Sequence, residues 1–218
     1  MSDRTKINTQ IRNLTQLLVK RSIVVSQNYP VYESNMLRWG KYQNLAFILK
    51  DEPYETIYSK CKDARDYNFM LIDGALIQMQ YEFKQNNLIS HVLGYYPNPN
   101  FENYQDNPEE FEELYFGIDL FTDMINKKTI IFPIRFDYSQ THTDIIHPKA
   151  HATFGNYRDC RIPISKPLSP NRFISFILRN FYNFKFTEEN LDGVIPLDLV
   201  FSEQVTSNEK KLLHLTYE

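Results

Sequence analysis

The chain contains few of the residues that mark several common protein classes. Its 218 residues include 2 cysteines, 6 glycines and 1 tryptophan. The cysteines, Cys61 and Cys160, are too few for a disulfide framework, and neither belongs to a CxxC pair, so each is predicted to be a small buried side chain. The N-terminus lacks the apolar core of a secretory signal, and no apolar run reaches the length that spans a bilayer. We therefore expect a cytoplasmic protein without a membrane segment.

Several motifs of well-known enzyme classes are also missing. The chain has no Walker A loop, no GxGxxG fingerprint and no GxSxG elbow. These absences argue against nucleotide-cofactor folds and against hydrolases built on a serine elbow.

The residues that are present describe a globular protein with an aromatic core. Hydrophobic residues make up 42% of the chain and charged residues 23%, while 15 tyrosines and 16 phenylalanines supply nearly all the aromatic side chains. Such a composition suits a β-containing core, and the length suffices for one large domain. The net charge of -3 argues against a dedicated nucleic-acid binder with an overall basic surface.

Charge is nevertheless unevenly distributed. Residues 98–125 contain eight acidic side chains and no basic one, whereas residues 130–185 contain eight Lys or Arg against three Asp. The plain interpretation is that these arginines and lysines are solvated or structural charges. The alternative interpretation is a local surface for an anionic substrate.

Helical periodicity occurs at both ends of the chain. It predicts helices over residues 8–25, over residues 42–49 and from Pro53 onward, which makes residues 1–66 a helical N-terminal section. Ser169-Pro170 fits the start of a helix that ends near Phe184. In the C-terminal extension, residues 187–218, the segment from Thr206 to Glu209 fits a capping box.

The middle of the chain has the patterns of strands, and the clearest is residues 75–83, where apolar and polar side chains alternate. Four strands are predicted, the first two forming a hairpin, at residues 75–83, 88–96, 129–138 and 150–155. Pro133 lies inside the third strand and favours an edge position or a bulge there. We expect a single α+β domain over residues 1–218, with a central antiparallel sheet in residues 67–186 flanked by N-terminal and C-terminal helices.

Three of the five histidines, His142, His147 and His151, lie within ten residues of one another. Imidazole titrates closest to neutral pH, so the cluster suggests acid/base groups or metal ligands. Spacings of five and four residues allow convergence on one ion, but no HExxH or CxxC motif accompanies them. We therefore expect no metal and no cofactor. A structural role, with His151 in the core and His147 in a loop, is the third interpretation.

Metal-independent acid/base chemistry is the interpretation that we develop. Alternation places Arg135 and Asp137 on one face of a strand, beside the strand that carries His151, with His147 at its entrance. Cleavage of a phosphodiester needs a general base, a general acid and a cation, and these residues can supply all three. We predict that His147 and His151 form the acid/base pair, Arg135 stabilises charge and Asp137 orients an imidazole; His142 is expected to be peripheral.

A second group of residues is predicted to bind the substrate. It consists of Arg158, Arg161, Tyr138 and Lys149. Arg158 and Arg161 flank Cys160 and could clamp a phosphate, because the planar guanidinium matches phosphate geometry. They could equally form an ion-pair network with Asp159 that anchors the loop.

Several segments together resemble a known family. They are residues 73–83 (DGALIQMQYEF), 91–99 (HVLGYYPNP), 135–138 (RFDY), 147–151 (HPKAH), 160–163 (CRIP) and 168–170 (LSP). In combination they resemble the uncharacterised bacterial family called domain of unknown function 2290, over nearly the whole chain. The resemblance implies a bacterial protein and brings no assigned activity. The order of hairpin, Arg/Asp strand, His strand and helix is also weakly similar to small toxin ribonucleases, at the level of the fold alone.

From these observations we expect a nuclease-like effector, directed at RNA, of a bacterial toxin or anti-phage system, with a protein partner or antitoxin. The alternative is a non-catalytic subunit of a defence or nucleic-acid-processing complex, in which the aromatic and acidic stretch 101–116 contacts the partner. A metal-dependent hydrolase is the third hypothesis.

Overall fold

The centre of the protein is an antiparallel β-sheet. The structure is a computed structural model, and it describes residues 1–39, 52–99, 132–143, 145–155, 157 and 159–217. The strands of the sheet are β1 (Val24–Gln27), β2 (Pro30–Glu33), β3 (Met36–Trp39), β4 (Phe69–Leu71), β5 (Leu76–Lys84), β6 (Asn87–Tyr96), β7 (Ile134–Ser139), β8 (Ala150–Phe154) and β9 (Ile162–Pro163). They follow the order β1-β4-β5-β6-β7-β8-β9, with the β2–β3 hairpin joined to β5 through β3.

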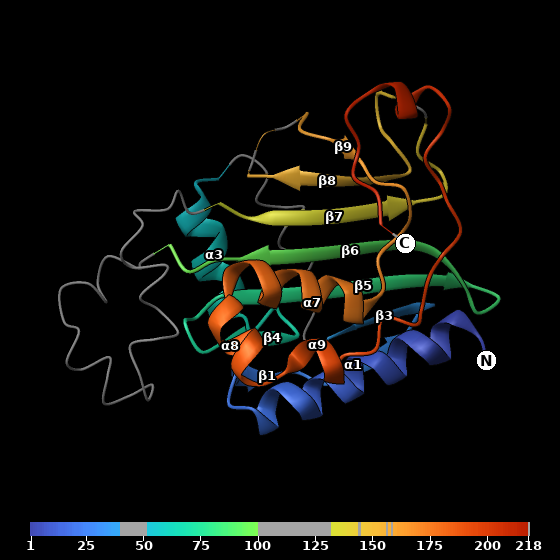
Figure 1. Ribbon diagram of the computed structural model, residues 1–218. Helices are drawn as coiled ribbons and strands as arrows, with labels where there is room; N and C mark the ends of the chain where they lie inside the picture. The colour runs from blue at the N-terminus through green and yellow to red at the C-terminus, as the bar shows by residue number, and fades with distance from the viewer. Residues whose placement is uncertain (40–51, 100–131, 144, 156, 158, 218) are drawn as a thin grey trace.

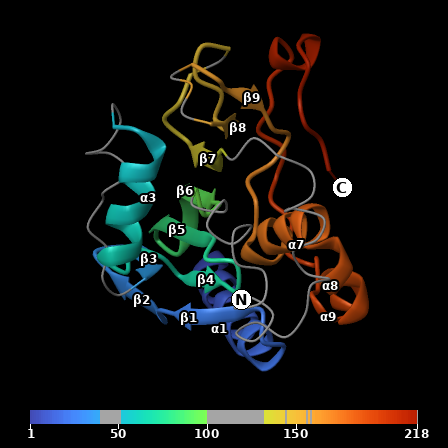
Figure 2. The same cartoon turned by 90° about the vertical axis from the view of Figure 1, so that its left-hand side faces the viewer.

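Helices lie on both faces of this sheet (Figure 1, Figure 2). One face carries α3 (Tyr54–Asp63). The other carries α1 (Asp3–Lys20), α7 (Pro170–Phe181), α8 (Asn183–Glu188) and α9 (Leu191–Val194), and a short 3-10 turn, η2 (Glu209–Lys211), lies near the C-terminus. This arrangement confirms the predicted α+β fold, with a central antiparallel sheet between N-terminal and C-terminal helices.

The longest strands, β5 and β6, form the predicted hairpin. Their last pair is Lys84 with Asn87, so the loop contains only Gln85 and Asn86. Both loop residues have positive φ, 51° and 70°. Two successive left-handed residues form the tight turn that matches the natural twist of a hairpin.

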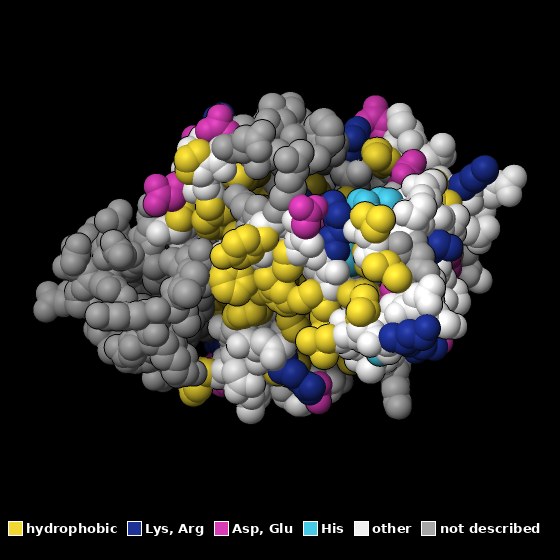
Figure 3. Space-filling view, turned by 90° about the horizontal axis from the view of Figure 1, so that it is seen from above, with side chains coloured by type: hydrophobic (Ala, Val, Ile, Leu, Met, Phe, Trp, Pro, Cys, Tyr) yellow, Lys and Arg dark blue, Asp and Glu magenta, His cyan; other side chains and the backbone are white. Residues whose placement is uncertain are grey.

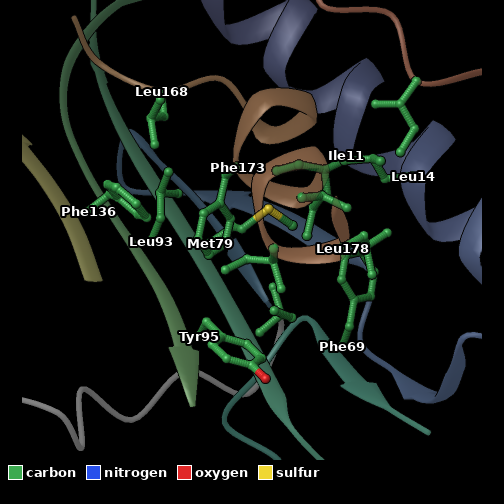
Figure 4. Close-up of a cluster of buried hydrophobic side chains, with 14 of the residues drawn as sticks. Ile11, Leu14, Phe69, Met79, Leu93, Tyr95, Phe136, Leu168, Phe173 and Leu178 are labelled. Carbon is green, nitrogen blue, oxygen red and sulfur yellow. The ribbon is translucent and has the colours of Figure 1, made fainter. Parts of the chain in front are cut away.

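The main core lies between the sheet and helices α1 and α7 (Figure 4). Ile11 and Leu14 of α1 point toward this core because they recur at helical spacing on one face. From β7, the ring of Phe136 packs edge-on against Phe173 and Phe176 of α7, at centroid distances of 5.9 and 5.4 Å. Edge-to-face aromatic pairs of this kind stabilise a core beyond the area that they bury. Phe136 therefore attaches β7 firmly to α7.

The start of α7 follows the sequence prediction. Ser169 is the N-cap, its hydroxyl accepts a hydrogen bond from the backbone N–H of Arg172 at 3.3 Å, and Pro170 occupies the first turn. The predicted end near Phe184 is displaced, because α7 ends at Phe181 and α8 follows. The capping box also forms, since the backbone N–H of Thr206 donates to Glu209 Oε2 at 2.7 Å and that of Glu209 donates to Thr206 Oγ1 at 3.2 Å, although only the short turn η2 follows it.

The prediction of a helical section over residues 1–66 is wrong for residues 24–39. Helix α1 ends at Lys20, and Ser22 then adopts a left-handed conformation with φ 53°. The chain continues as strands β1, β2 and β3. The β-branched run Ile23-Val24-Val25 favours extended backbone, and this local preference outweighs the helical spacing of the apolar residues before it. The helix predicted over residues 42–49 lies outside the described residues.

The position predicted for Pro133 also differs. Strand β7 begins at Ile134, so the proline precedes it, and β7 pairs with β6 on one side and β8 on the other. It is an interior strand rather than an edge strand, because a proline before the first residue removes no ladder hydrogen bond. Across the described part of the chain, no helix is both long and apolar enough to cross a bilayer.

A buried histidine in the main core gives the fold a testable pH dependence. His91 lies between Tyr81 and Tyr138, with ring centroids 5.6 and 5.7 Å away, and its Nε2 accepts a hydrogen bond from the backbone N–H of Leu168 at 3.0 Å. Burial lowers its pKa from 6.5 to about 3. As the pH falls below 6.5, His91 of the unfolded chain therefore binds a proton, whereas His91 of the folded chain binds it only near pH 3. The contribution of neutral His91 to the free energy of unfolding is complete above pH 6.5 and is lost as the pH falls toward 3.

We predict that the substitution His91→Gln weakens this pH dependence. Glutamine can still accept the hydrogen bond from Leu168 but does not titrate. Below pH 6.5 the free energy of unfolding of the unmodified protein should therefore fall by up to about 1.4 kcal/mol more per pH unit than that of the variant. Denaturant unfolding at pH 7.5 and pH 4.5 measures the difference. His214→Gln, at a partly exposed histidine, is the matched control. Equal pH dependence in the His91→Gln and unmodified proteins would contradict the assignment.

Candidate functional site

The candidate site lies where β7 and β8 run side by side. Asp137 on β7 stands directly opposite His151 on β8, and Arg135 stands opposite Thr153. Because side chains alternate along a strand, Arg135, Asp137 and His151 point to the face of the sheet opposite Phe136 and α7. The predicted convergence of these residues on one face is therefore present.

The connection from β7 to β8 adds two further imidazoles. The ring of His147 packs edge-on against His151 at a centroid distance of 5.0 Å, and His142 is stacked on His147 at 3.5 Å. One possible ligand atom from each of the three residues lies within 4.8 Å of those of the other two. His151 is buried, whereas His142 and His147 are only partly buried, and histidine side chains reach the surface beside Lys or Arg side chains in Figure 3.

The ring of His151 is held through one nitrogen and faces Asp137 with the other. Its Nδ1 lies 3.0 Å from the carbonyl oxygen of Pro148. A carbonyl can only accept, so Nδ1 carries the hydrogen and Nε2 keeps its lone pair in the neutral ring. Nε2 lies 3.6 Å from Asp137 Oδ2, and Arg135 Nη2 lies 3.6 Å from the same oxygen. Asp137 thus stands between a guanidinium and an imidazole.

Burial dominates the electrostatics of the cluster. It lowers the pKa of His147 and of His151 to about 4 and also lowers the pKa of His142. For His147, the neighbouring His142 and Arg161 add to the effect, because a charged imidazole would be repelled by them. Burial likewise raises the pKa of Asp137, against the opposing effect of Arg135. At neutral pH the three imidazoles are therefore uncharged and present free lone pairs.

Arg161 connects the cluster to the next strand. It precedes β9, and its Nη1 donates a hydrogen bond to the backbone carbonyl of Ile146 at 3.1 Å and lies 3.6 Å from Asp159 Oδ1. The side chain keeps 26% of its surface exposed. Arg161 therefore holds the loop that carries His147 and still presents part of its charge to solvent. Of the two interpretations from the sequence, an anchoring ion pair and a phosphate clamp, the first is visible in these contacts.

The other predicted substrate-binding residues lie elsewhere. Tyr138 points to the opposite face of β7 and packs on His91, and together with Lys149 it lines a separate pocket near Asn87. Arg158 lies outside the described residues. His142, expected to be peripheral because it sits in a polar loop, is instead stacked on His147, since the loop folds back over β8. The stretch 101–116, predicted to contact a partner, also lies outside the described residues.

Sequence reasoning missed Gly94 and Tyr96 on β6. Gly94 pairs with Arg135, and the ring of Tyr96 lies across Gly94 so closely that any side chain there would overlap it. The positive charge of Arg135 lies near the buried Tyr96 hydroxyl, where it opposes the rise in pKa that burial causes. The signal was the glycine itself, since a glycine inside a strand often marks a close approach.

Comparison with known proteins identifies a family and nothing closer. The model of a family described as "Uncharacterized conserved protein (DUF2290)" matches residues 23–217. The match includes β7, β8, β9 and the loop with His142 and His147. No curated protein and no solved structure matches the chain.

The close approach of Tyr96 to Gly94 generates a prediction about coupling. Gly94→Ala should destabilise the protein by about 1–3 kcal/mol, because the new methyl group displaces the Tyr96 ring. In a Tyr96→Leu background the same substitution should cost less, with a coupling free energy above about 0.5 kcal/mol. Denaturant unfolding of the two single variants and the double variant completes the cycle. If the losses of stability in the two single variants simply add in the double variant, the position of the Tyr96 ring does not depend on Gly94.

Proposed function

We propose, for a chain that belongs to the DUF2290 family of uncharacterised conserved proteins, that the histidine cluster cleaves phosphodiester bonds in nucleic acid, with RNA as the first candidate substrate. The observation that carries this proposal is the grouping of His147, His151 and Asp137 with the guanidinium groups of Arg135 and Arg161. Neutral imidazoles can accept a proton, and arginines can stabilise a phosphate that gains negative charge.

In the proposed reaction one imidazole transfers a proton from the attacking hydroxyl group to the leaving oxygen. A neutral imidazole of His147 or His151 takes the proton from an attacking hydroxyl group, and the hydroxyl oxygen forms a bond to phosphorus. The bond from phosphorus to the leaving oxygen breaks, and the imidazolium returns the proton to that oxygen. Both arginines can meet the phosphate, because Arg135 keeps 33% and Arg161 26% of the side chain exposed, and the planar guanidinium suits phosphate.

The cellular setting is part of the same proposal. An enzyme of this kind would act in the bacterial cytoplasm as an effector of a toxin or anti-phage system, under the control of a protein partner or antitoxin. The two free cysteines, Cys61 and Cys160, suit a reducing compartment. Exposed apolar side chains beside the cluster, Ile145 at 50% and Ile146 at 80% of their surface, suit contact with a partner.

We predict that the purified full-length chain cleaves single-stranded RNA, and that His147→Ala lowers kcat by about 100-fold or more because a proton acceptor is lost. Asp137→Asn should also lower kcat, since it removes the ionisable carboxyl group next to His151 but keeps the shape of the side chain. The assay uses end-labelled single-stranded RNA, duplex RNA and single-stranded DNA. His214→Ala, a histidine substitution far along the chain, should retain full activity.

Two results would count against this function. One is a cleavage rate that stays the same when His147→Ala and Asp137→Asn are combined, which would place the activity elsewhere. The other is a well-folded protein that cuts none of the substrates. If that protein also forms a stable stoichiometric complex with a partner, the alternative hypothesis of a non-catalytic subunit takes its place.

A further inference from the structure

The histidine cluster has an arrangement that simple acid/base chemistry does not require. An acid/base pair needs two imidazoles, whereas three converge here, each with a ring in contact with another. Nδ1 of His142 is buried and makes no hydrogen bond of normal geometry to a described residue, although the carbonyl of Pro148 is near enough to oppose the lowering of the pKa of this ring. A buried polar atom without a partner is costly, and protein structures usually satisfy it with another group, a water or an ion. The third imidazole therefore needs its own explanation.

The spacing of the three imidazoles is close to that of a metal site. Zinc binds imidazole nitrogen at about 2.0–2.1 Å, so two nitrogens of a tetrahedral site lie about 3.3 Å apart. The three possible ligand atoms already lie within 4.8 Å of one another. A movement of about 1.5 Å or less would bring them to coordinating distance. His142 and His147 lie on a connection between strands, which can make such a movement more easily than β8.

The outer contacts of His151 also fit a ligand. Metal-binding histidines usually donate their second ring N–H to a carbonyl or a carboxylate, which fixes the tautomer and the ring orientation. His151 Nδ1 makes this contact with the carbonyl of Pro148, and Nε2 remains free on the side of the cluster. Asp137 Oδ2 lies 3.6 Å from Nε2, too far for a direct hydrogen bond. Its carboxylate is placed to hold a water or hydroxide beside an ion.

The donor set selects the class of ion. Three neutral imidazoles suit zinc, copper, nickel, cobalt or ferrous iron, whereas magnesium and calcium prefer oxygen ligands. Three histidines with an open fourth position are a known arrangement for catalytic zinc. The rings of His142 and His147 are only partly buried, so the cluster is in contact with solvent.

We propose that His142, His147 and His151 bind one divalent transition-metal ion, zinc in the first place, with Asp137 as the neighbouring carboxylate. The inference rests on the proposed function for the reaction and changes its proton acceptor. Imidazole nitrogens that hold an ion have no lone pair left for a proton, so with the ion bound the attacking group would be activated by the ion and its proton would pass to Asp137. Binding of the ion can be measured without any substrate. Tyr138, Lys149 and the pocket that they line take no part.

The test uses the full chain without a histidine tag, stripped of metal with a chelator and then freed of the chelator. Cobalt(II) is titrated in while visible absorption is recorded, and zinc is added afterwards. We expect one cobalt ion per chain, visible bands typical of low coordination number, and displacement by zinc. The double substitution His142→Ala with His147→Ala should weaken zinc binding by about 100-fold or more, because loss of mere outer contacts already costs 10- to 100-fold. His214→Ala should bind as the unmodified chain does.

The metal inference is overturned if the chain takes up no cobalt or zinc, or if the double variant binds either ion as tightly as the unmodified chain. Measuring RNA cleavage on the same samples keeps the two proposals apart. Cleavage by a chain that binds no ion and resists chelator leaves the proposed function standing without the metal. Stoichiometric binding lost in the double variant, with no cleavage of any substrate, supports the metal site and removes the proposed function.

Discussion

The hydrogen bond from His151 Nδ1 to the carbonyl of Pro148 is the contact on which the candidate site depends. It joins the first residues of β8 to the loop before it, and it fixes which ring nitrogen carries the hydrogen. Because Nε2 then keeps its lone pair, the side of the ring near Asp137 can accept a proton or bind an ion. The loop before Pro148 carries His147 and His142, whose rings complete the cluster beside His151.

The two faces of the sheet differ in what they contribute: one forms the core and the other carries the candidate site. On one face, Phe136 packs on α7 and His91 is enclosed by Tyr81 and Tyr138, so β6 and β7 are held in place by a dense aromatic core. On the other face the same strands present Arg135, Asp137 and the Tyr96 ring. A site on the outer face of interior strands inherits their rigidity, which is what a precise arrangement of ionisable groups needs. The imidazoles supplied by the loop are the adjustable part.

The sequence allowed much of this to be predicted where a pattern was local. Alternation identified β5, the apolar run that follows it identified β6 as its hairpin partner, and a further short strand was predicted at β8. The pair Ser169-Pro170 identified the start of α7. Alternation also placed Arg135, Asp137 and His151 on one face. The strands β1, β2 and β3 were missed because each is only four residues long and follows a strongly helical pattern. Tyr138 was misplaced although alternation along β7 puts it on the face of Phe136, opposite Arg135 and Asp137. His142 was misplaced for a different reason. The path of the loop depends on tertiary contacts such as the bond from Arg161 to Ile146, and these contacts leave no periodic signal in the chain.

The most direct test of the account is the tautomer of His151 in the metal-free protein. A long-range proton–nitrogen NMR spectrum of the imidazole groups at neutral pH, assigned with the His214→Ala and His147→Ala variants, distinguishes the two neutral forms from the charged one. The account predicts a neutral His151 ring with hydrogen on Nδ1, and neutral rings for His142 and His147. A His151 ring with hydrogen on Nε2, or one that is charged at pH 7, would contradict it.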